Sequence, residues 1–180
     1  PPPGAPAGAV PARVRTPEDV SVNLGVPDFR PSALPFLADR ERDRYRVEVA
    51  GETVELGAVS MGNPHAVIAV PSVAAAPVER LGAAFQRSPS FPKRVHGGFL
   101  ERVDERHIRL RVYERGVGET LACGTGAAAA VAVGRRWGEL GERVAVELPG
   151  GTLEVNWSGP GTPLWQTGPT AAVYEGYIDI

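Results

Sequence analysis

A single cysteine at the start of a glycine-rich segment is the part of the sequence best suited to chemistry. Cys123 is the only cysteine among the 180 residues, and Gly124, Thr125 and Gly126 follow it directly. The pattern predicts a helix over residues 124–137, which would place the thiol where free backbone N–H groups carry roughly half a positive charge. We therefore expect a lowered thiol pKa and a binding site for a carboxylate. The alternative is that Cys123 is a small buried apolar side chain beside a glycine cap.

An acidic and a basic side chain precede this cysteine by nine and eight residues. Glu114 and Arg115 are separated from Cys123 by a glycine-containing loop that could fold back towards the thiol. Arginine can bind a carboxylate through two parallel hydrogen bonds, and a glutamate can accept hydrogen bonds from an ammonium group. The pair therefore suits a zwitterionic ligand. The alternative is an exposed salt bridge at a strand end, which would contribute little to stability.

A turn after a strand-like run supplies two further polar side chains. In the segment GNPH, the Asn63 amide and the His65 imidazole could point into a cleft. A histidine after such a turn can equally have a structural role, and the sequence leaves both interpretations open. The sequence contains no recognisable phosphate-binding glycine loop, Cys/His zinc cluster or acidic calcium loop. We therefore expect a reaction without a metal ion or a cofactor.

Composition and charge limit the kinds of partner. The formal net charge is −2, from 19 basic and 21 acidic residues, so the chain as a whole does not attract nucleic acid or acidic membrane surfaces. No apolar run approaches the roughly 20 residues that a membrane-spanning helix needs. A lone cysteine cannot form an intramolecular disulfide. We expect a cytoplasmic protein that binds a small molecule and neither nucleic acid nor membrane.

Short alternating stretches predict most of the chain to be strand. Strands are expected within residues 12–27, 45–62, 65–73, 94–116, 143–157 and 170–180. The segment 94–116 is predicted to be a solvent-facing hairpin, and the segment 170–180 a closing strand. The proline-rich residues 1–9 have too little apolar bulk to join a core and are expected to be a disordered leader.

Two helices are predicted, and they differ in character. Residues 76–88 carry apolar side chains on one helical face, which is typical of a surface helix: Val78, Leu81, Ala84 and Phe85. The helix over residues 124–137 is apolar on nearly every side between Ala127 and Val133, which is typical of a helix enclosed by protein. Together these elements predict an α+β fold in which a curved, largely antiparallel sheet wraps around a buried central helix.

Four sequence motifs resemble those of diaminopimelate epimerase, in the same order and over about residues 20–180. They are MGNPHAV, RVYERGVGETLACGTGAAAAVAVG, VELPGGTLEVNW and PLWQTGPTAAVYEG. The resemblance implies two similar lobes, each a curved sheet around a central helix, with one active cysteine from each lobe. It also implies interconversion of LL- and meso-diaminopimelate for lysine and peptidoglycan precursors, without pyridoxal phosphate.

The resemblance also assigns roles to single residues. It makes Cys123 the catalytic thiol of the C-terminal lobe and places His65 and Glu114 to assist its ionisation. Gly124 and Thr125 match contacts to the α-carboxylate of the substrate. The contacts to its distal end match Asn63, Glu114 and Arg115, while His96 stands where the family usually has a substrate-binding asparagine.

The chain also departs from the family pattern. The motif of the first-lobe cysteine is absent, so we interpret residues 1–19 as a leader and a remnant of that lobe. Residues 20–180 are then the C-terminal lobe, with a final strand able to pair with the missing lobe. Inversion needs a proton acceptor on one face of the α-carbon and a donor on the other. The chain alone is therefore expected to be inactive, with a missing N-terminal half or a second copy as partner.

Two other functions remain open at this point. The chain could be a catalytically dead module that binds an amino-acid carboxylate or has a structural role. It could also be an acyl-transfer enzyme in which Cys123 is the nucleophile and His65 its base.

Overall fold

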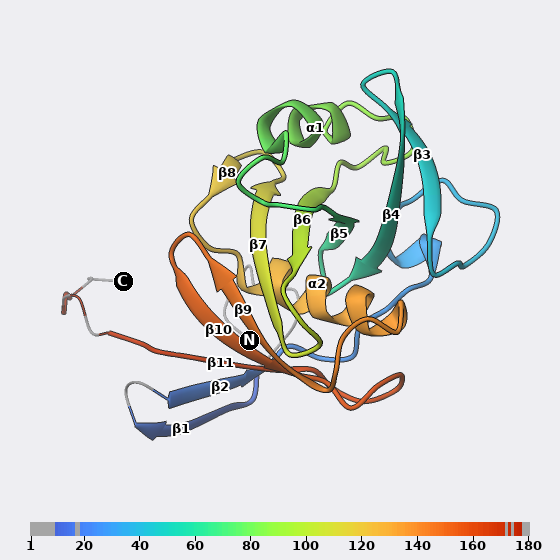
Figure 1. Ribbon diagram of the computed structural model, residues 1–180. Helices are drawn as coiled ribbons and strands as arrows, with labels where there is room; N and C mark the ends of the chain where they lie inside the picture. The colour runs from blue at the N-terminus through green and yellow to red at the C-terminus, as the bar shows by residue number, and fades with distance from the viewer. Residues whose placement is uncertain (1–9, 17–18, 172, 174, 178–180) are drawn as a thin grey trace.

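Strands of a single sheet and two α-helices make up most of the described chain. A computed structural model describes residues 10–16, 19–171, 173 and 175–177. Its strands are β1 (Ala12–Thr16), β2 (Asp19–Asn23), β3 (Tyr45–Val49), β4 (Glu52–Ser60), β5 (Pro64–Ala69), β6 (His96–Arg102), β7 (His107–Glu114), β8 (Gly118–Thr120), β9 (Arg143–Leu148), β10 (Gly151–Asn156) and β11 (Trp165–Gly168). The helices are α1 (Val78–Phe85) and α2 (Gly124–Arg136), with a short 3₁₀ turn at Pro31–Ala33. Figure 1 shows α2 on the concave side of the strands.

The sheet is mixed but largely antiparallel, as predicted. Its strand order is β1-β2-β11-β10-β9-β7-β6-β5-β4-β3, and β8 pairs with β7 beside this path. Within the described residues the parallel pairings are β5 with β6 and β7 with β9. The parallel pairing of β5 with β6 sets His65 opposite His96 in register. Two imidazoles from segments 31 residues apart are thereby held side by side at the same level of the sheet.

Helix α2 is enclosed because its side chains are small and the sheet has glycines where it passes. Residues 126–134 are all buried, and the helix contacts β4, β5, β6, β7 and β10. A Cβ atom at Gly57 of β4 would lie only 2.3 Å from Cγ1 of Val133. At Gly134 a Cβ would lie 2.5 Å from Cδ1 of Leu140. These glycines permit close packing of α2 against its surroundings, and the prediction of a buried central helix is confirmed.

Helix α1 is a surface helix with one apolar face, also as predicted. It buries Val78, Leu81, Ala84 and Phe85 against a second hydrophobic cluster that includes Phe91 and Phe99. The cluster around α2 is separate and contains Val59, Val67, Cys123 and Trp157 among its members. Buried polar residues are few, and His65 and His96 are two of them. Neither described helix is long and apolar enough to cross a lipid bilayer.

One detail of the predicted strands is wrong, and the predicted strand over residues 170–180 lies only partly within the described residues. The hairpin of β6 and β7 forms, but it is not solvent-facing along β6, because residues 96–100 are buried and both α1 and α2 contact this strand. The closing strand is β11, which ends at Gly168, and the described residues among 170–177 are outside any strand. Pro169 follows β11 directly, and proline cannot donate a ladder hydrogen bond.

The predicted N-terminal boundary is not tested by the fold. The expected disordered leader, residues 1–9, lies outside the described residues. Strand β1 belongs to the predicted remnant, and it pairs with β2, which in turn pairs with β11. The division into residues 1–19 and 20–180 stays a prediction.

Candidate active site

Cys123 lies at the N-terminal end of α2 with its side chain almost fully buried. The residue has an extended backbone (φ −140°, ψ 105°) and immediately precedes the first residue of the helix. Only 7% of its surface is exposed. Its Sγ lies 3.7 Å from the Thr125 hydroxyl oxygen. A Cβ at Gly126 would lie 3.2 Å from this sulfur, so glycine at 126 leaves room for the thiol against the helix.

The pKa of the Cys123 thiol is raised above its ordinary value of 9.0, which makes the expectation of a lowered pKa wrong for the ligand-free protein. Burial is the largest cause, because it disfavours the charged thiolate. Hydrogen bonds from the Thr125 hydroxyl and the Gly126 backbone N–H lower the pKa, but by less. The Glu114 carboxylate raises it further through its charge and by accepting a hydrogen bond. The free protein therefore holds a neutral thiol at neutral pH.

Asn63 and His65 reach the start of α2 from the turn that begins β5. Gly62 has a φ of +90°, a conformation that glycine adopts readily, and this turn directs the next residues inward. The His65 Nε2 atom lies 3.0 Å from the Asn63 Oδ1 atom and 3.1 Å from the Thr125 hydroxyl. The Asn63 amide nitrogen donates to the same hydroxyl oxygen at 3.2 Å. His65 is thus linked to Cys123 through Thr125.

Burial keeps His65 neutral. It lowers the pKa of His65 to about 3, with smaller contributions from the charges of His96 and Arg115. Burial also lowers the pKa of His96, and Glu114 partly opposes that shift. The two rings stack with centroids 4.8 Å apart. A pair of stacked imidazoles in a buried site is compatible with two neutral rings, since two like charges there would repel.

Glu114 and His96 face one another beside the thiol. The Oε2 atom of Glu114 lies 3.8 Å from Nδ1 of His96, which also accepts a 3.3 Å hydrogen bond from the Arg115 backbone N–H. The other carboxylate oxygen, Oε1, accepts a 2.6 Å hydrogen bond from the Thr120 hydroxyl. Thr120 is not among the site residues predicted from the sequence. Its position six residues after Glu114, on the strand paired with β7, is the signal that could have identified it.

The Arg115 guanidinium contacts the Lys93 carbonyl in the ligand-free protein, and its charge still acts on His65 and His96. Its Nη1 atom donates to the Lys93 carbonyl at 3.3 Å, and the residue is exposed. Among the described residues Glu114 and Arg115 form no ion pair. Arg115 therefore lies at the rim, where a bound molecule could attract its side chain.

Gln166 is a second residue that the sequence analysis missed. Its amide nitrogen donates to the Gly124 carbonyl at 3.1 Å, which ties β11 to the first turn of α2. A Cβ at Gly124 would lie 2.9 Å from the Gln166 Oε1 atom, so glycine is needed at 124 for this approach. The signal was present in the sequence, because Gln166 lies inside the WQTGP motif.

Most of the predicted site residues meet at the N-terminal end of α2, around Cys123 and Gly124, which is called the mouth of α2 below. Those brought together are Asn63, His65, His96, Glu114, Cys123, Gly124 and Thr125, with Arg115 at the rim. The first turn of α2 has no acidic residue and no side-chain cap. The Gly124 and Thr125 backbone N–H groups, which precede the helical hydrogen bonds, are therefore available to a carboxylate. One set of potential metal ligands exists among the described residues: His96, Glu114 and Cys123.

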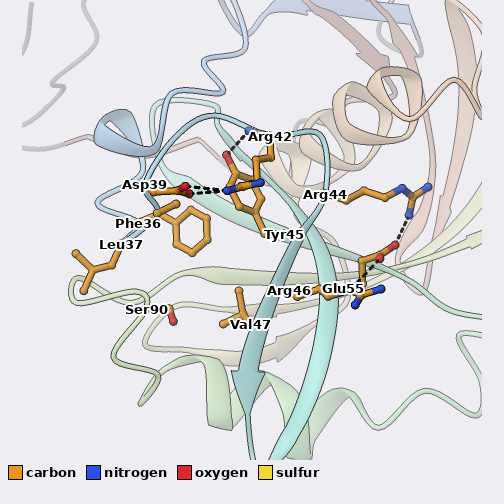
Figure 2. Close-up of a pocket in the computed structure, with 11 residues that line it drawn as sticks. Phe36, Leu37, Asp39, Arg42, Arg44, Tyr45, Arg46, Val47, Glu55 and Ser90 are labelled. Atoms are coloured by element: carbon orange, nitrogen blue, oxygen red, sulfur yellow. Dashed lines mark hydrogen bonds and ion pairs between the residues drawn. The ribbon is translucent and has the colours of Figure 1, made fainter.

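Two surface cavities lie away from this group of residues. Figure 2 shows one of about 490 Å³ beside β3, in which Asp39 pairs with Arg42, while Arg44 and Arg46 reach Glu55. A second, of about 600 Å³, lies beside Trp157. Neither contains a predicted site residue. The mouth of α2 is instead flanked by apolar side chains in solvent, since Val117 and Leu121 are more than 70% exposed.

The sequence model of the diaminopimelate epimerase family matches residues 57–173, which include the second half of β4, all of β5 to β11 and every predicted site residue. The chain belongs to the diaminopimelate epimerase family. A diaminopimelate epimerase from Ectopseudomonas mendocina is 49% identical over 174 residues. The match covers 97% of this chain and 63% of that relative, so the chain spans less than two thirds of its relative's length.

Solved structures with low sequence identity share the fold. A probable proline racemase from Agrobacterium radiobacter K84 superposes with a TM-score of 0.58 at 18% identity, over 90% of this chain and 54% of that one. A hydroxyproline epimerase from Agrobacterium vitis gives 0.55 at 19% identity, over 84% and 50%. A PhzF-family phenazine biosynthesis protein from Bacillus anthracis gives 0.55 at 16% identity, over 89% and 61%. These likenesses support the α+β fold of the family.

Proposed function

We propose that this chain supplies one face of an amino-acid epimerase active site, in which Cys123 transfers a proton at the α-carbon of diaminopimelate. The observation that carries the proposal is a lone thiol at an uncapped helix start, surrounded by the polar side chains of Asn63, His65 and Glu114. Membership of the diaminopimelate epimerase family supports the choice of substrate.

The start of α2 would hold the α-carboxylate of the substrate. Hydrogen bonding within the helix begins when the Ala127 N–H donates to the Cys123 carbonyl, so the N–H groups of Gly124 and Thr125 precede the helical ladder. An α-proton is very weakly acidic, and its removal leaves negative charge that spreads onto the carboxylate. Fixed N–H donors at that carboxylate stabilise the charge as it develops. This stabilisation allows the thiol chemistry to proceed without pyridoxal phosphate.

The raised pKa of the Cys123 thiol indicates whether this group first donates or first accepts a proton. Because the thiol is neutral at rest, Cys123 is the acid in the first turnover: its S–H proton passes to the α-carbon and leaves a thiolate. The proton on the opposite face leaves to a second group. Cys123 is the only cysteine in the sequence, so a second thiol has to come from outside these 180 residues. In the reverse direction, the Glu114 carboxylate beside the sulfur is placed to receive the thiol proton.

Two alternatives make different predictions. The raised thiol pKa also favours a module that binds an amino acid without turning it over. An acyl-transfer nucleophile needs a base in contact with the sulfur, whereas His65 contacts the Thr125 hydroxyl, and burial lowers its pKa to about 3, which makes it a weak base.

Deuterium incorporation at the α-carbon of diaminopimelate, measured with the 180-residue chain in D₂O, tests the proposal. We expect slow exchange with no more than trace inversion, because one thiol serves one face. The absence of exchange at any pH would favour the binding module. Acylation of Cys123 by an ester probe would support the nucleophile, and rapid inversion by the purified chain would refute the single-face proposal.

A further inference from the structure

Three side chains that ligate metals converge at the mouth of α2 from three separate segments. His96 begins β6, Glu114 ends β7 and Cys123 precedes α2. One ligand atom from each lies within 4.8 Å of the other two. Around a tetrahedral zinc ion, bond lengths of 2.0–2.3 Å place ligand atoms roughly 3.5 Å apart. The Nδ1 atom of His96 and Oε2 of Glu114 are already 3.8 Å apart. Side-chain movements of about 1 Å would therefore bring all three ligand atoms to the separations that a tetrahedral zinc ion requires.

We propose that His96, Glu114 and Cys123 bind a divalent cation such as zinc. The bound cation would inhibit proton transfer because it coordinates the Cys123 sulfur. The binding rests on geometry alone, whereas the inhibition rests on the proposed function of Cys123. A set of one thiolate, one imidazole and one carboxylate favours zinc or cobalt over magnesium or calcium, which prefer oxygen ligands. Three protein ligands leave a fourth position for water or a substrate group.

Neighbouring polar side chains orient two of the three ligands, Glu114 and His96. The Thr120 hydroxyl holds Glu114 through Oε1 and leaves Oε2 directed towards His96. Metal-bound histidines usually donate their second ring N–H to a polar partner, and the Asn63 amide lies 3.3 Å from Nε2 of His96. Rotating that amide by half a turn would offer its oxygen to the Nε2 proton. The cation would replace the 3.3 Å hydrogen bond from the Arg115 N–H to Nδ1.

Cobalt(II) titration of the 180-residue chain tests the binding, because a sulfur ligand gives a thiolate-to-cobalt charge-transfer band. We expect one equivalent to bind, with zinc displacing it. Cys123→Ser should lose the band. His96→Asn and Glu114→Gln should weaken affinity by more than the roughly 10- to 100-fold that loss of an outer partner costs.

His107→Asn is the matched control, because His107 also lies beside a glutamate, at 3.3 Å from Glu147, but on the surface. It should bind cobalt as the unaltered chain does. Circular dichroism of each variant separates lost ligands from lost folding. Binding that survives unchanged in folded Cys123→Ser or His96→Asn would overturn the site.

Exchange at the α-carbon, measured with and without one equivalent of zinc, tests the inhibition. We expect zinc to suppress exchange and a chelator to restore it. Exchange that continues at full zinc occupancy would overturn the inhibition. Zinc binding by a chain that shows no exchange under any condition would support the site and reject the proposed function.

Discussion

The two helices of this chain begin in opposite ways, and the difference locates the chemistry. Helix α1 is eight residues long, has an exposed face and carries Glu79 in its first turn. Helix α2 is thirteen residues long, is enclosed over most of its length and has no acidic residue or side-chain cap at its start. Neither helix start has a side-chain cap, but Glu79 places a negative charge in the first turn of α1, whereas the start of α2 is left for the thiol and a ligand.

The same comparison shows that a helix start does not by itself activate a thiol. The hydrogen bond from the Gly126 N–H lowers the pKa of the Cys123 thiol, yet burial outweighs it and the pKa is raised. Position along a helix and depth of burial act on the thiolate with opposite signs. At the start of α2, the effect of burial on the Cys123 pKa is larger than the effect of the helix.

The largest predicted difference between the two helix starts is catalytic. Cys123→Ser should reduce α-deuterium exchange at least about 100-fold, because the proton-transferring group is lost. Glu79→Gln at the start of α1 should leave exchange unchanged and alter the free energy of unfolding by less than about 0.5 kcal/mol. Mass spectrometry of diaminopimelate and thermal unfolding measure the two effects. If Cys123→Ser kept the exchange rate of the unaltered chain, the start of α2 would not be the site of the chemistry.

The stability cost of adding a methyl group next to each helix should also differ, although by less than the exchange rates do. Gly57→Ala should cost about 1–3 kcal/mol, because its methyl group would overlap Val133 on a helix with no room to move. Gly82→Ala in α1 would overlap Tyr113, but α1 can shift towards solvent, and alanine favours a helix by up to about 1 kcal/mol over glycine. Urea denaturation should therefore rank Gly57→Ala as the more destabilising change. The opposite ranking would mean that α2 is not the more tightly enclosed helix.

The buried histidine beside α2 should make stability depend on pH. Folded His65 stays neutral down to a pKa of about 3, while the unfolded chain binds a proton near 6.5. Stability is therefore full above pH 6.5 and falls with acid, by about 1 kcal/mol from pH 6.5 to 5.5. The difference in unfolding free energy between the unaltered chain and His65→Gln should shrink over that range. A difference independent of pH would show that His65 titrates normally.

The smallest effects concern the thiol's two polar neighbours and have opposite signs. Glu114→Gln should speed alkylation of Cys123 at pH 8, because the carboxylate raises the pKa, and Thr125→Val should slow it, because the hydroxyl lowers the pKa. Changes of about 2- to 10-fold are expected, since one pKa unit alters the thiolate fraction tenfold. Iodoacetamide kinetics followed by mass spectrometry give both rates. Equal rates in the two variants would contradict the assigned causes.

Periodicity predicted the elements well where one face of the chain is distinctly apolar. The enclosed α2 and the apolar face of α1 follow from residue spacing alone. The described residues of the predicted closing strand over 170–180 are outside any strand; the alternation there gives no sign of where pairing stops, whereas Pro169 does. The burial of β6 was missed because it depends on α1 and α2, which pack against this strand from other parts of the sequence.

The site was predicted as a set of residues but not as an electrostatic environment. Residue types and spacing selected most of the set, the resemblance added His96 and the individual roles, and the fold brings seven of its members together. The raised pKa of Cys123 depends on how deeply the thiol is buried, and spacing does not encode depth. Thr120 and Gln166 were missed for a related reason, because each acts through a contact made by another strand.

The most direct test of the account is whether the thiol titration and the α-carbon chemistry share one pH midpoint. Alkylation of Cys123 reports the thiol, and deuterium exchange into diaminopimelate reports the chemistry, with both measured on the same chain. The account predicts coincident midpoints above 9.0 and no exchange in Cys123→Ser. A thiol midpoint at or below 9.0, or exchange whose pH dependence ignores the thiol, would contradict it.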